Sequence, residues 1–536
     1  MKKVRQNALL LFFCVIFNSS TSSAAADAAS DAGLREQLQQ RLNHPSSTRL
    51  VSRLALRAFY EKRDFRPLWV SATGFSDIGE NWFNILQTAA DDGLEPADYR
   101  LTQIGQLSRA TGNNALTDLE LALGDAYLKY CEQLSTGRLK PYLADSEWHI
   151  RGPIFDASAV LDTLSESSRL KKTFKGLRPA SEQYLQLKEV LRRYRKIETQ
   201  GGWPQIPEAA DLKSGMRHQV AIVLRNRLRI SNDFEGEMQA DPYYFDAALD
   251  DALRRFQRRH GLRANGVLND KTRDALNIDV DRRIEQIKIA LERWRWLPAD
   301  LGDRFVWVSP VGAAVTVMKQ GNEVLAMRAI VGRPYRATPS FAATLNKVVI
   351  NPTWTVPRSI AVADLLPVQQ KDASFFQRKH IRVFSNGKNA KEIDPADIDW
   401  SALDKDNFPY KLRQDAGPKN SLGRIKFAFP NPYDIYLHDT PGKFLFNLPN
   451  RTFSSGCVRI EKPLEFASSL ATTEWTIDEI QKDIDAGTTR AVNLLTPTPI
   501  YLVYMTTRVN ADGDVYFHDD VYARDAAVSK AWAASL

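Results

Sequence analysis

The chain has 536 residues, enough for roughly three or four domains of ordinary size. Hydrophobic residues make up 43% and charged residues 25%, which excludes a mainly disordered, collagen-like or multi-spanning membrane protein. The formal net charge of +8 is mild and dispersed, so nucleic-acid binding is not predicted. The three cysteines, Cys14, Cys131 and Cys457, are too few and too far apart for a disulfide framework or a cysteine-rich zinc site.

The first 26 residues have the pattern of a secretory signal peptide. A basic start precedes an apolar run over 8–17, and small residues at 24–26 form a cleavage site. The run is shorter than the about 18 apolar residues that span a bilayer, and no later segment is long and uncharged enough to do so. We therefore expect residues 1–26 to be removed on export, leaving no transmembrane span. An uncleaved anchor is the alternative.

Two segments follow the signal. Small and polar residues at the start of 27–44 predict a flexible linker. From 45 to 214, apolar residues recur at helical spacing, which predicts a helical domain with helix ends at Gly93 and Gly137. Cys131 falls on the apolar stripe of one of these helices, so we interpret it as a buried structural thiol.

A second helical unit is expected over 215–278. Its apolar positions predict three short helices with a turn at 260–262. Residues 249–277 also resemble the peptidoglycan-binding domain, through a Phe-Gln pair, a Gly-Leu pair and a Thr-x-x-Ala-Leu ending. Asn265 and Asn269 depart from that pattern. A structural spacer that has kept the fold without the ligand is therefore an open alternative.

Beyond a linker helix expected over 279–303, the apolar period changes from 3.6 to 2. Short β-branched and aromatic runs, separated by Gly and Pro, predict a β-rich domain over 304–505. A polar stretch with helical character interrupts these strands and indicates an inserted subdomain or lid over 358–422. Residues 506–536 are expected to form a C-terminal tail.

Two residues suited to nucleophilic catalysis occur in the β-rich domain. His438 lies 19 positions before Cys457, and an imidazole is the base suited to take a thiol proton near neutral pH. Gly456 allows a sharp turn before the nucleophile, where N–H groups can hold an oxyanion. Strand alternation places Tyr436 with His438, and Arg459 with Cys457. The pattern predicts a cysteine nucleophile activated by histidine.

The segment from His438 to Arg459 resembles the catalytic motif of the YkuD-type L,D-transpeptidases, in which a histidine precedes Ser-x-Gly-Cys-hydrophobic-Arg/Asn. Segments 291–298, 331–339 and 351–357 resemble the large periplasmic YcbB-type branch of that family. That branch combines a helical scaffold domain, a three-helix peptidoglycan-binding domain and a β-rich catalytic domain with a capping insertion. The resemblance covers nearly the whole mature chain and implies a multidomain α+β fold.

The resemblance also implies catalytic roles. Cys457 would be the nucleophile and His438 its base and later its acid. The histidine would be oriented by an oxygen of Asp439, either the backbone carbonyl or the carboxylate. The N–H groups of Gly456 and Cys457 would line the oxyanion hole.

The same resemblance implies substrate contacts. Arg459 and Trp354 would hold the stem peptide, with Tyr436 nearby. Ser455 stands where the family commonly has a histidine, a change expected to affect substrate contacts more than the nucleophile.

The implied reaction is attack on the third residue of a tetrapeptide stem with release of D-Ala. The thioester then passes to a diaminopimelate amine of another stem, giving a 3→3 cross-link, or to a free D-amino acid. Peptidoglycan stem peptides and glycan would be the partners, with cell-wall synthases as further partners. The location would be the periplasm of a Gram-negative envelope, and carbapenems would acylate Cys457.

Other functions share some of these features. A papain-like Cys/His peptidoglycan peptidase has its nucleophile before its histidine, the reverse of the order here. A sortase has the order His, Cys, Arg but a longer separation and no binding module. A non-catalytic wall-binding scaffold would not need the intact motif at 454–459. The histidines and carboxylates show no ligand spacing, so no metal or cofactor is predicted.

Overall fold

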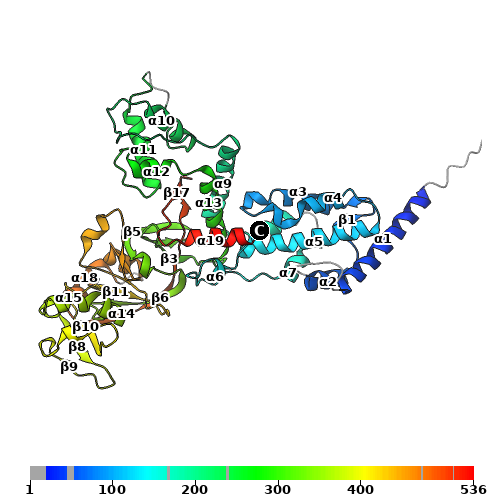
Figure 1. Ribbon diagram of the computed structural model, residues 1–536. Helices are drawn as coiled ribbons and strands as arrows, with labels where there is room; N and C mark the ends of the chain where they lie inside the picture. The colour runs from blue at the N-terminus through cyan, green and yellow to red at the C-terminus, as the bar shows by residue number, and fades with distance from the viewer. Residues whose placement is uncertain are drawn as a thin grey trace, which may run out of the picture. The chain divides into compact units, whose positions relative to one another are not determined.

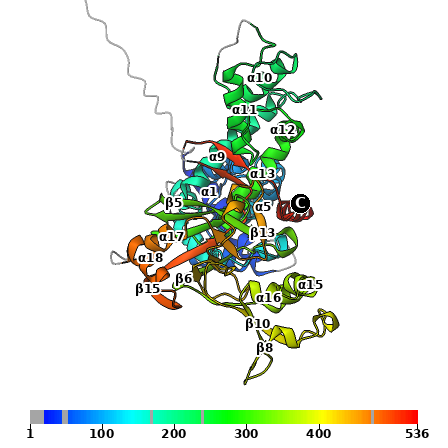
Figure 2. The ribbon, with the colours of Figure 1, turned by 90° about the vertical axis from the view of Figure 1, so that its left-hand side faces the viewer.

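The computed structural model describes residues 20–44, 53–165, 170–236, 241–471, 475–510 and 512–535 (Figure 1, Figure 2). They belong to two compact units, unit 1 (Met1–Arg138 and Ile154–Arg178) and unit 2 (Leu139–Pro153 and Pro179–Leu536). Most of the expected signal peptide, 1–26, lies outside the described residues. Within the described part, no helix combines the length and the apolar character that a membrane crossing requires.

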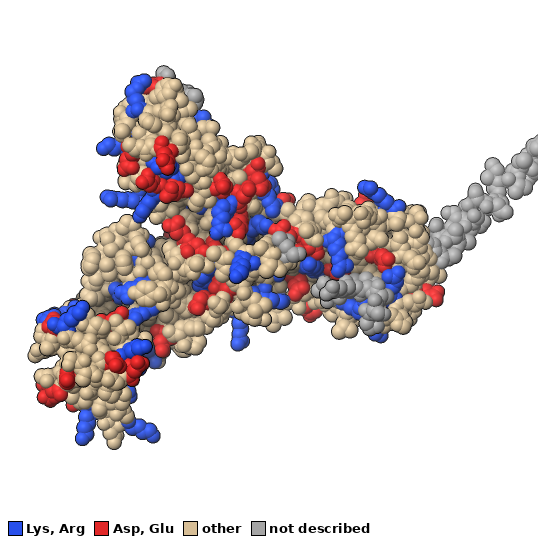
Figure 3. Space-filling view, viewed as in Figure 1, with Lys and Arg blue, Asp and Glu red and all other residues tan. Residues whose placement is uncertain are grey.

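Charged side chains are dispersed over the surface. On the face shown in Figure 3, Lys and Arg are interspersed with Asp and Glu, and neither kind gathers into one large area. Some form exposed pairs, such as Lys62 Nζ with Asp162 Oδ1 at 3.0 Å in unit 1.

Unit 1 is helical and surrounds one long helix, α5 (Asn113–Thr136). The other elements are α1 (Ser20–Asn43), α2 (Arg53–Lys62), the hairpin β1 (Val70–Ser71) and β2 (Gly74–Phe75), α3 (Asp77–Gln87), α4 (Leu101–Leu107), α7 (Ala157–Asp162) and α8 (Leu170–Leu177). Helix α5 ends at Gly137, with φ 86°, and Gly93, with φ 70°, ends a short 3-10 helix. Both expected helix ends are confirmed, because these backbone conformations favour glycine.

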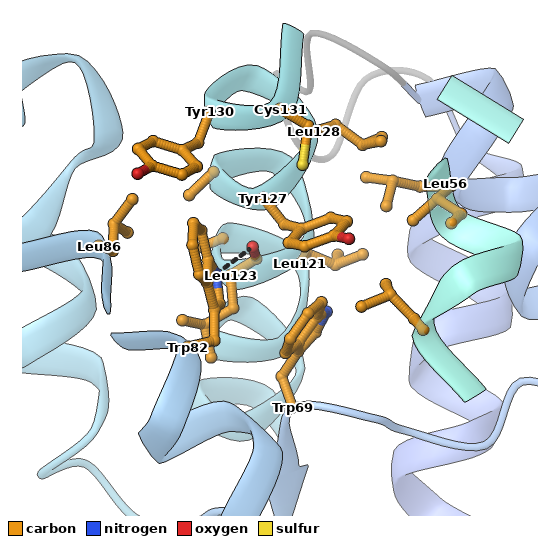
Figure 4. Packing of buried hydrophobic residues seen from close by; sticks show 14 of the residues in the cluster. Leu56, Trp69, Trp82, Leu86, Leu121, Leu123, Tyr127, Leu128, Tyr130 and Cys131 are labelled. Carbon is orange, nitrogen blue, oxygen red and sulfur yellow. Dashed lines mark hydrogen bonds between the residues drawn. The ribbon is translucent and has the colours of Figure 1, made fainter. Parts of the chain in front are cut away.

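The core of unit 1 is rich in aromatic rings (Figure 4). Trp82 Nε1 donates a hydrogen bond to Leu123 O at 3.2 Å, and Tyr127 packs beside the indole ring. Cys131 lies on the same helix, α5, and is fully buried. Burial raises the pKa of its thiol well above the ordinary value, so the sulfur stays protonated and unreactive. The expected burial of Cys131 is confirmed.

The expected flexible linker over 27–44 is wrong. This segment lies in α1, and Leu34, Leu38 and Leu42 are buried in the core of unit 1. Their spacing of four residues places the three side chains on one helix face. The composition of the segment does not reveal this short apolar repeat, because small residues dominate its start.

Two further boundaries differ from those expected. The predicted helical domain over 45–214 is divided, because 139–153 and 179–214 belong to unit 2. There α9 (Glu182–Thr199) packs against α13 (Val280–Arg295), the helix expected as a linker. Burial of Trp294 and Trp296 in this cluster makes α13 part of a core.

The predicted tail, 506–536, also belongs to that core. It contains the hairpin β16 (Thr507–Val509) and β17 (Val515–Phe517) and the helix α19 (Arg524–Ala534). Asp525 on α19 is fully buried and forms an ion pair with Arg293 of α13. Arg524 pairs with Asp145 at 2.8 Å. These buried charges are paired only because segments far apart in sequence meet.

The peptidoglycan-binding-like region has three helices around its own hydrophobic cluster, α10 (Val220–Ile230), α11 (Ala247–Arg259) and α12 (Asp270–Leu276). Both departures from the family pattern have structural roles. Asn269 caps α12 by accepting a hydrogen bond from Thr272 N at 3.0 Å. Asn265 Oδ1 accepts one from Val267 N at 3.1 Å. The two asparagines therefore support the fold of this region.

The β-rich domain contains a nine-stranded sheet in the order β13-β5-β14-β12-β11-β6-β15-β3-β4, and β4 also pairs with β5, which closes the sheet. The strands are β3 (Arg304–Ser309), β4 (Ala314–Lys319), β5 (Asn322–Gly332), β6 (Phe341–Ile350), β11 (Ile425–Ala428), β12 (Leu437–His438), β13 (Thr452–Ser454), β14 (Val458–Ile460) and β15 (Arg490–Leu502). Helices α17 (Pro463–Leu470) and α18 (Ile477–Asp485) contribute to its core. The predicted mixed α+β fold is confirmed.

The insertion, residues 358–422, folds around a hydrophobic cluster that also includes Trp354 and Val356, and Tyr436 packs against this cluster. Its strands β8 (Ile381–Ser385), β9 (Glu392–Ile393) and β10 (Tyr410–Gln414) form a sheet with β7 (Trp354–Thr355), which precedes the insertion. Its helical part comprises α14 (Arg358–Ile360), a π-helix (Ala361–Leu365), α15 (Leu366–Lys371) and α16 (Phe375–Arg378). The pairing of β7 with β10 ties the insertion to the segment that leads into it, and this small sheet is separate from the nine-stranded one.

Candidate active site

The candidate base and nucleophile lie on neighbouring segments of the large sheet. Strands β12 and β14 pair in parallel, which aligns His438 with Arg459. Cys457 immediately precedes β14, and Val458 N donates a hydrogen bond to Tyr436 O at 3.1 Å. The sequence suggests a simple strand, loop and strand, but the connection includes β13, which pairs with β5. Backbone pairing thus places the two predicted residues in one region.

His438 is buried, with 4% of its surface exposed. Its Nδ1 lies 2.5 Å from the backbone oxygen of Asp439. The Asp439 carboxylate has other partners, since Oδ1 accepts from Lys443 Nζ at 2.5 Å and Oδ2 from Arg424 N at 2.8 Å. Of the two oxygens left open by the sequence, the backbone carbonyl is the one that contacts the ring. It assigns the proton to Nδ1 and leaves Nε2 as the basic nitrogen.

Burial, and after it the positive charge of Arg459, lowers the pKa of His438 to about 3. The imidazole is therefore neutral at pH 7. The backbone carbonyls of Asp439 and Leu422 act in the opposite direction and favour an imidazolium. Among the described residues, no hydrogen bond joins this ring to the Cys457 thiol. Such contacts are often long before substrate binds.

The Cys457 thiol is partly buried, and its Sγ lies 3.6 Å from Asp434 O. Burial raises the pKa of this thiol, and interactions with Tyr436, Lys426 and Arg459 partly offset the increase. The resting site therefore contains a protonated thiol and a neutral imidazole. Proton transfer must then accompany attack on the substrate.

A second cation accompanies Arg459 at the site, and the sequence analysis missed it. Lys426 on β11 is aligned with His438 on β12, and its Nζ lies 3.8 Å from the centre of the Tyr436 ring. Burial lowers the pKa of Lys426, and the Cys457 thiolate would raise it. This lysine therefore favours the ionised sulfur. The sequence could not predict this position, because residue alternation along β11 does not show which strand pairs with it.

The cysteine loop, residues 454–457, is held by hydrogen bonds within itself. Gly456 has φ 115°, a conformation that favours glycine, and its N–H donates to Ser454 Oγ at 3.1 Å. The Ser454 hydroxyl in turn donates to Cys457 O at 2.5 Å. The Gly456 N–H is therefore engaged with Ser454 in this structure, and its place in the oxyanion hole stays a prediction. In the described part of the chain, the Cys457 N–H has no protein acceptor and faces no such competition.

The segment 331–339 holds the loop from outside. Thr338 Oγ1 donates to Gly456 O at 2.8 Å and accepts from Gly332 N at 3.0 Å. Arg333 N donates to Ser454 O at 3.0 Å. Sequence reasoning missed Thr338 and Ser454. The family-like character of both segments is the only signal that could have pointed to them.

We expect Ser454→Ala to destabilise the catalytic domain. The hydroxyl is buried and serves two backbone groups, and its loss would cost about 1–3 kcal/mol through unsatisfied Gly456 N and Cys457 O. Urea unfolding measures this change. Ser469→Ala on α17 is the control, because its hydroxyl makes one local bond to Phe466 O. Equal stability of the two variants would contradict the assigned role.

The residues predicted to contact the substrate differ in how many of their polar groups already have partners and in how much of each side chain is exposed. Arg459 Nε is buried without a hydrogen-bond partner, and no ion pair involves this residue among those of the described residues. Ser455 Oγ accepts a hydrogen bond from Arg336 Nη1 at 2.8 Å. Tyr436 borders the thiol, and burial raises its pKa above the ordinary value. Trp354 is 8% exposed within the hydrophobic cluster of the insertion, so little of its indole remains for a ligand.

Comparison with known proteins identifies the parts of the chain. A family described as "Scaffold domain" matches residues 54–191, and "Putative peptidoglycan binding domain" matches 222–276. A family described as "L,D-transpeptidase catalytic domain" matches 303–489.

A curated relative from Haemophilus influenzae, named "Putative L,D-transpeptidase", is 36% identical over 214 residues. The match covers 40% of this chain and 43% of the relative, so the chain spans less than half of that protein's length. A crystal structure of an L,D-transpeptidase from Xylanimonas cellulosilytica shares 13% identity, with a TM-score of 0.17. That match covers 56% of this chain and 98% of the other.

The family match includes every residue of the candidate site. Cys457, His438 and Arg459 all lie within 303–489; His438 and Arg459 are on paired strands of the closed sheet, and Cys457 immediately precedes one of them. The resemblance seen in the sequence is confirmed. The β-rich region of this protein is therefore a YkuD-type L,D-transpeptidase catalytic domain, carried by a chain that also has matches to a scaffold domain and a peptidoglycan-binding domain.

Proposed function

We propose that this protein is a peptidoglycan L,D-transpeptidase that forms 3→3 cross-links through a thioester on Cys457. The observation that carries the proposal is the parallel pairing of β12 with β14 inside the matched catalytic domain. This pairing places a histidine with a fixed tautomer beside the strand that follows the cysteine. Thiol, base and cation then meet in one region.

In the first half-reaction, Cys457 Sγ attacks the carbonyl of the third residue of a tetrapeptide stem while His438 Nε2 takes the thiol proton. The Cys457 N–H donates to the developing oxyanion. The bond to the terminal D-Ala nitrogen then breaks, and His438 returns the proton to that nitrogen. A thioester remains, and D-Ala leaves.

In the second half-reaction, the side-chain amine of a diaminopimelate in another stem attacks the thioester. His438 takes a proton from this amine, the carbon–sulfur bond breaks, and the proton passes to the departing sulfur. The products are a 3→3 amide and a regenerated thiol. The carbonyls of Asp439 and Leu422 favour the imidazolium formed in both steps.

Substrate binding is proposed to depend on Arg459. A buried guanidinium nitrogen without a protein partner is costly, and a carboxylate of the stem peptide would satisfy it. Tyr436 lies next to the thiol and would contact the same stem. Ser455 and Trp354 contribute through their neighbours, because Arg336 and the insertion already contact them.

The insertion, residues 358–422, is proposed to cap the thioester. Water is present at ~55 M, so a transferase must exclude it and hold the acceptor amine in place. The insertion follows closely after β7, and Tyr436 beside the thiol packs against its hydrophobic cluster, which is the place a cap over the thioester would need.

The remaining parts are proposed to act at the cell wall. The three-helix domain over 215–278 would bind glycan, and the helical domain would support the catalytic domain among cell-wall synthases. Removal of residues 1–26 on export would place the protein in the periplasm. Metal ions and cofactors have no part in the proposed chemistry.

Purified tetrapeptide muropeptides, incubated with the protein and followed by mass spectrometry, test the proposal. We expect D-Ala release and a 3→3 dimer. A Cys/His peptidase would give tripeptide without dimer, and a non-catalytic scaffold would bind sacculi and leave the muropeptides unchanged. A carbapenem should add one inhibitor mass to the intact protein at Cys457. No mass increase, with tetrapeptide consumed, would contradict the thioester mechanism.

A further inference from the structure

A single guanidinium joins the cysteine loop to the insertion. Arg336 Nη1 donates to Ser455 Oγ at 2.8 Å, two residues before Cys457. The same nitrogen forms an ion pair with Asp364. Asp364 belongs to the π-helix of the insertion, and Arg333 lies 3.9 Å from its other oxygen. Two distant segments are therefore bound to one side chain.

The backbone around Arg336 is constrained. Arg336 ends a 3-10 turn that starts at Pro334, and its carbonyl oxygen would lie 2.2 Å from a Cβ placed on Gly332. Only glycine at 332 allows this close approach. Thr338, two residues later, is bonded to the cysteine loop. The guanidinium is thus carried by a segment fixed to the loop, and Asp364 is the partner free to move with the insertion.

The ion pairs of Asp364 differ from the other ion pairs of the insertion in the segments that they connect. Among the ion pairs of the described residues, only those of Asp364 connect 358–422 with the remainder of the catalytic domain. Arg336 and Asp364 are 21% and 31% exposed, so solvent weakens the pair less than it does a fully exposed one. A π-helix turn is a rare element, and the few that occur are often found at functional sites.

We propose that Arg336 is a positioning residue that couples the insertion to the cysteine loop. While Asp364 is bound, the insertion is held over the thioester, and Ser455 is held by the same guanidinium. Release of Asp364 lets the insertion move away and admits water. The inference rests on the proposed transpeptidase function and adds the contact that decides between amine and water.

The test compares the ratio of 3→3 dimer to hydrolysed tripeptide with the rate of Cys457 acylation. Asp364→Asn keeps the shape and removes the charge, so we expect the ratio to fall about fivefold with acylation nearly unchanged. Arg336→Met also loses the Ser455 bond, so both quantities should fall. Arg336→Lys keeps the charge but lacks the planar guanidinium that contacts both partners, so it should also lower both quantities.

A double-mutant cycle separates coupling from two independent effects. If the residues act together, Asp364→Asn should lower the ratio no further in the Arg336→Met background. Asp372→Asn is the matched control, since Asp372 pairs at 2.5 Å with Arg378 on an exposed part of the same insertion. An unchanged ratio in folded Asp364→Asn and Arg336→Lys would overturn the inference. Absence of thioester in the wild type would instead overturn the proposed function.

Discussion

Replacing Cys457 by alanine should lower D-Ala release from tetrapeptide stems by about 10³-fold or more. The substitution removes the only described thiol of the catalytic domain, which interacts with Tyr436, Lys426 and Arg459. Gly456 and the Ser454 hydrogen bonds stay in place, so the fold should be retained. Released D-Ala and the intact-protein mass are the measurements, and the variant should show no covalent adduct.

Cys131→Ser is the matched control. That residue lies in the core of unit 1, where burial raises the pKa of its thiol. The reaction rate should stay within a few-fold of wild type, while unit 1 should lose stability because a hydroxyl replaces a buried sulfur. Persisting D-Ala release by Cys457→Ala would refute the nucleophile assignment.

Replacing His438 by glutamine should lower the acylation rate by about 10²–10⁴-fold. An amide can occupy the site and donate to Asp439 O, but it cannot accept the thiol proton near neutral pH. Binding of the stem peptide should persist, because Arg459 is untouched. A single-turnover acylation assay, together with a separate binding assay, distinguishes a loss of acylation from a loss of binding. Equal losses of binding and acylation would indicate a structural role for His438.

The pH dependence gives a second test of the same pair. A histidine whose pKa is lowered stays neutral as pH falls through 6.5, so acylation should persist below that pH until the folded pKa of about 3 is approached. Burial raises the pKa of Cys457, so iodoacetamide alkylation of the free enzyme should increase steadily toward alkaline pH. A plateau of alkylation near pH 6–7 would reveal a preformed thiolate and contradict this assignment.

Periodicity and residue type predicted much of the architecture. Strands β3 and β4 alternate buried and less buried residues, and the buried stripe of α5 repeats at helical spacing. Such patterns are local, because the spacing of apolar residues within one element already shows which of its faces is buried. Composition does not predict helix α1, since its three buried leucines lie in a mainly polar segment. The elements of 506–536 escape prediction for a different reason, because they pack on α9 and α13, which are far away in sequence.

One short motif is enough to identify the reactive groups, Cys457, His438 and Arg459. The partners of these groups follow from the folded chain. The Asp439 carbonyl proved to be the ring's partner, the Gly456 N–H proved to be engaged by Ser454, and Arg336 met a carboxylate 28 residues away. Spacing along the chain predicts faces and turns. Partners across a sheet depend on strand order and register, which arise when segments far apart in sequence pack together.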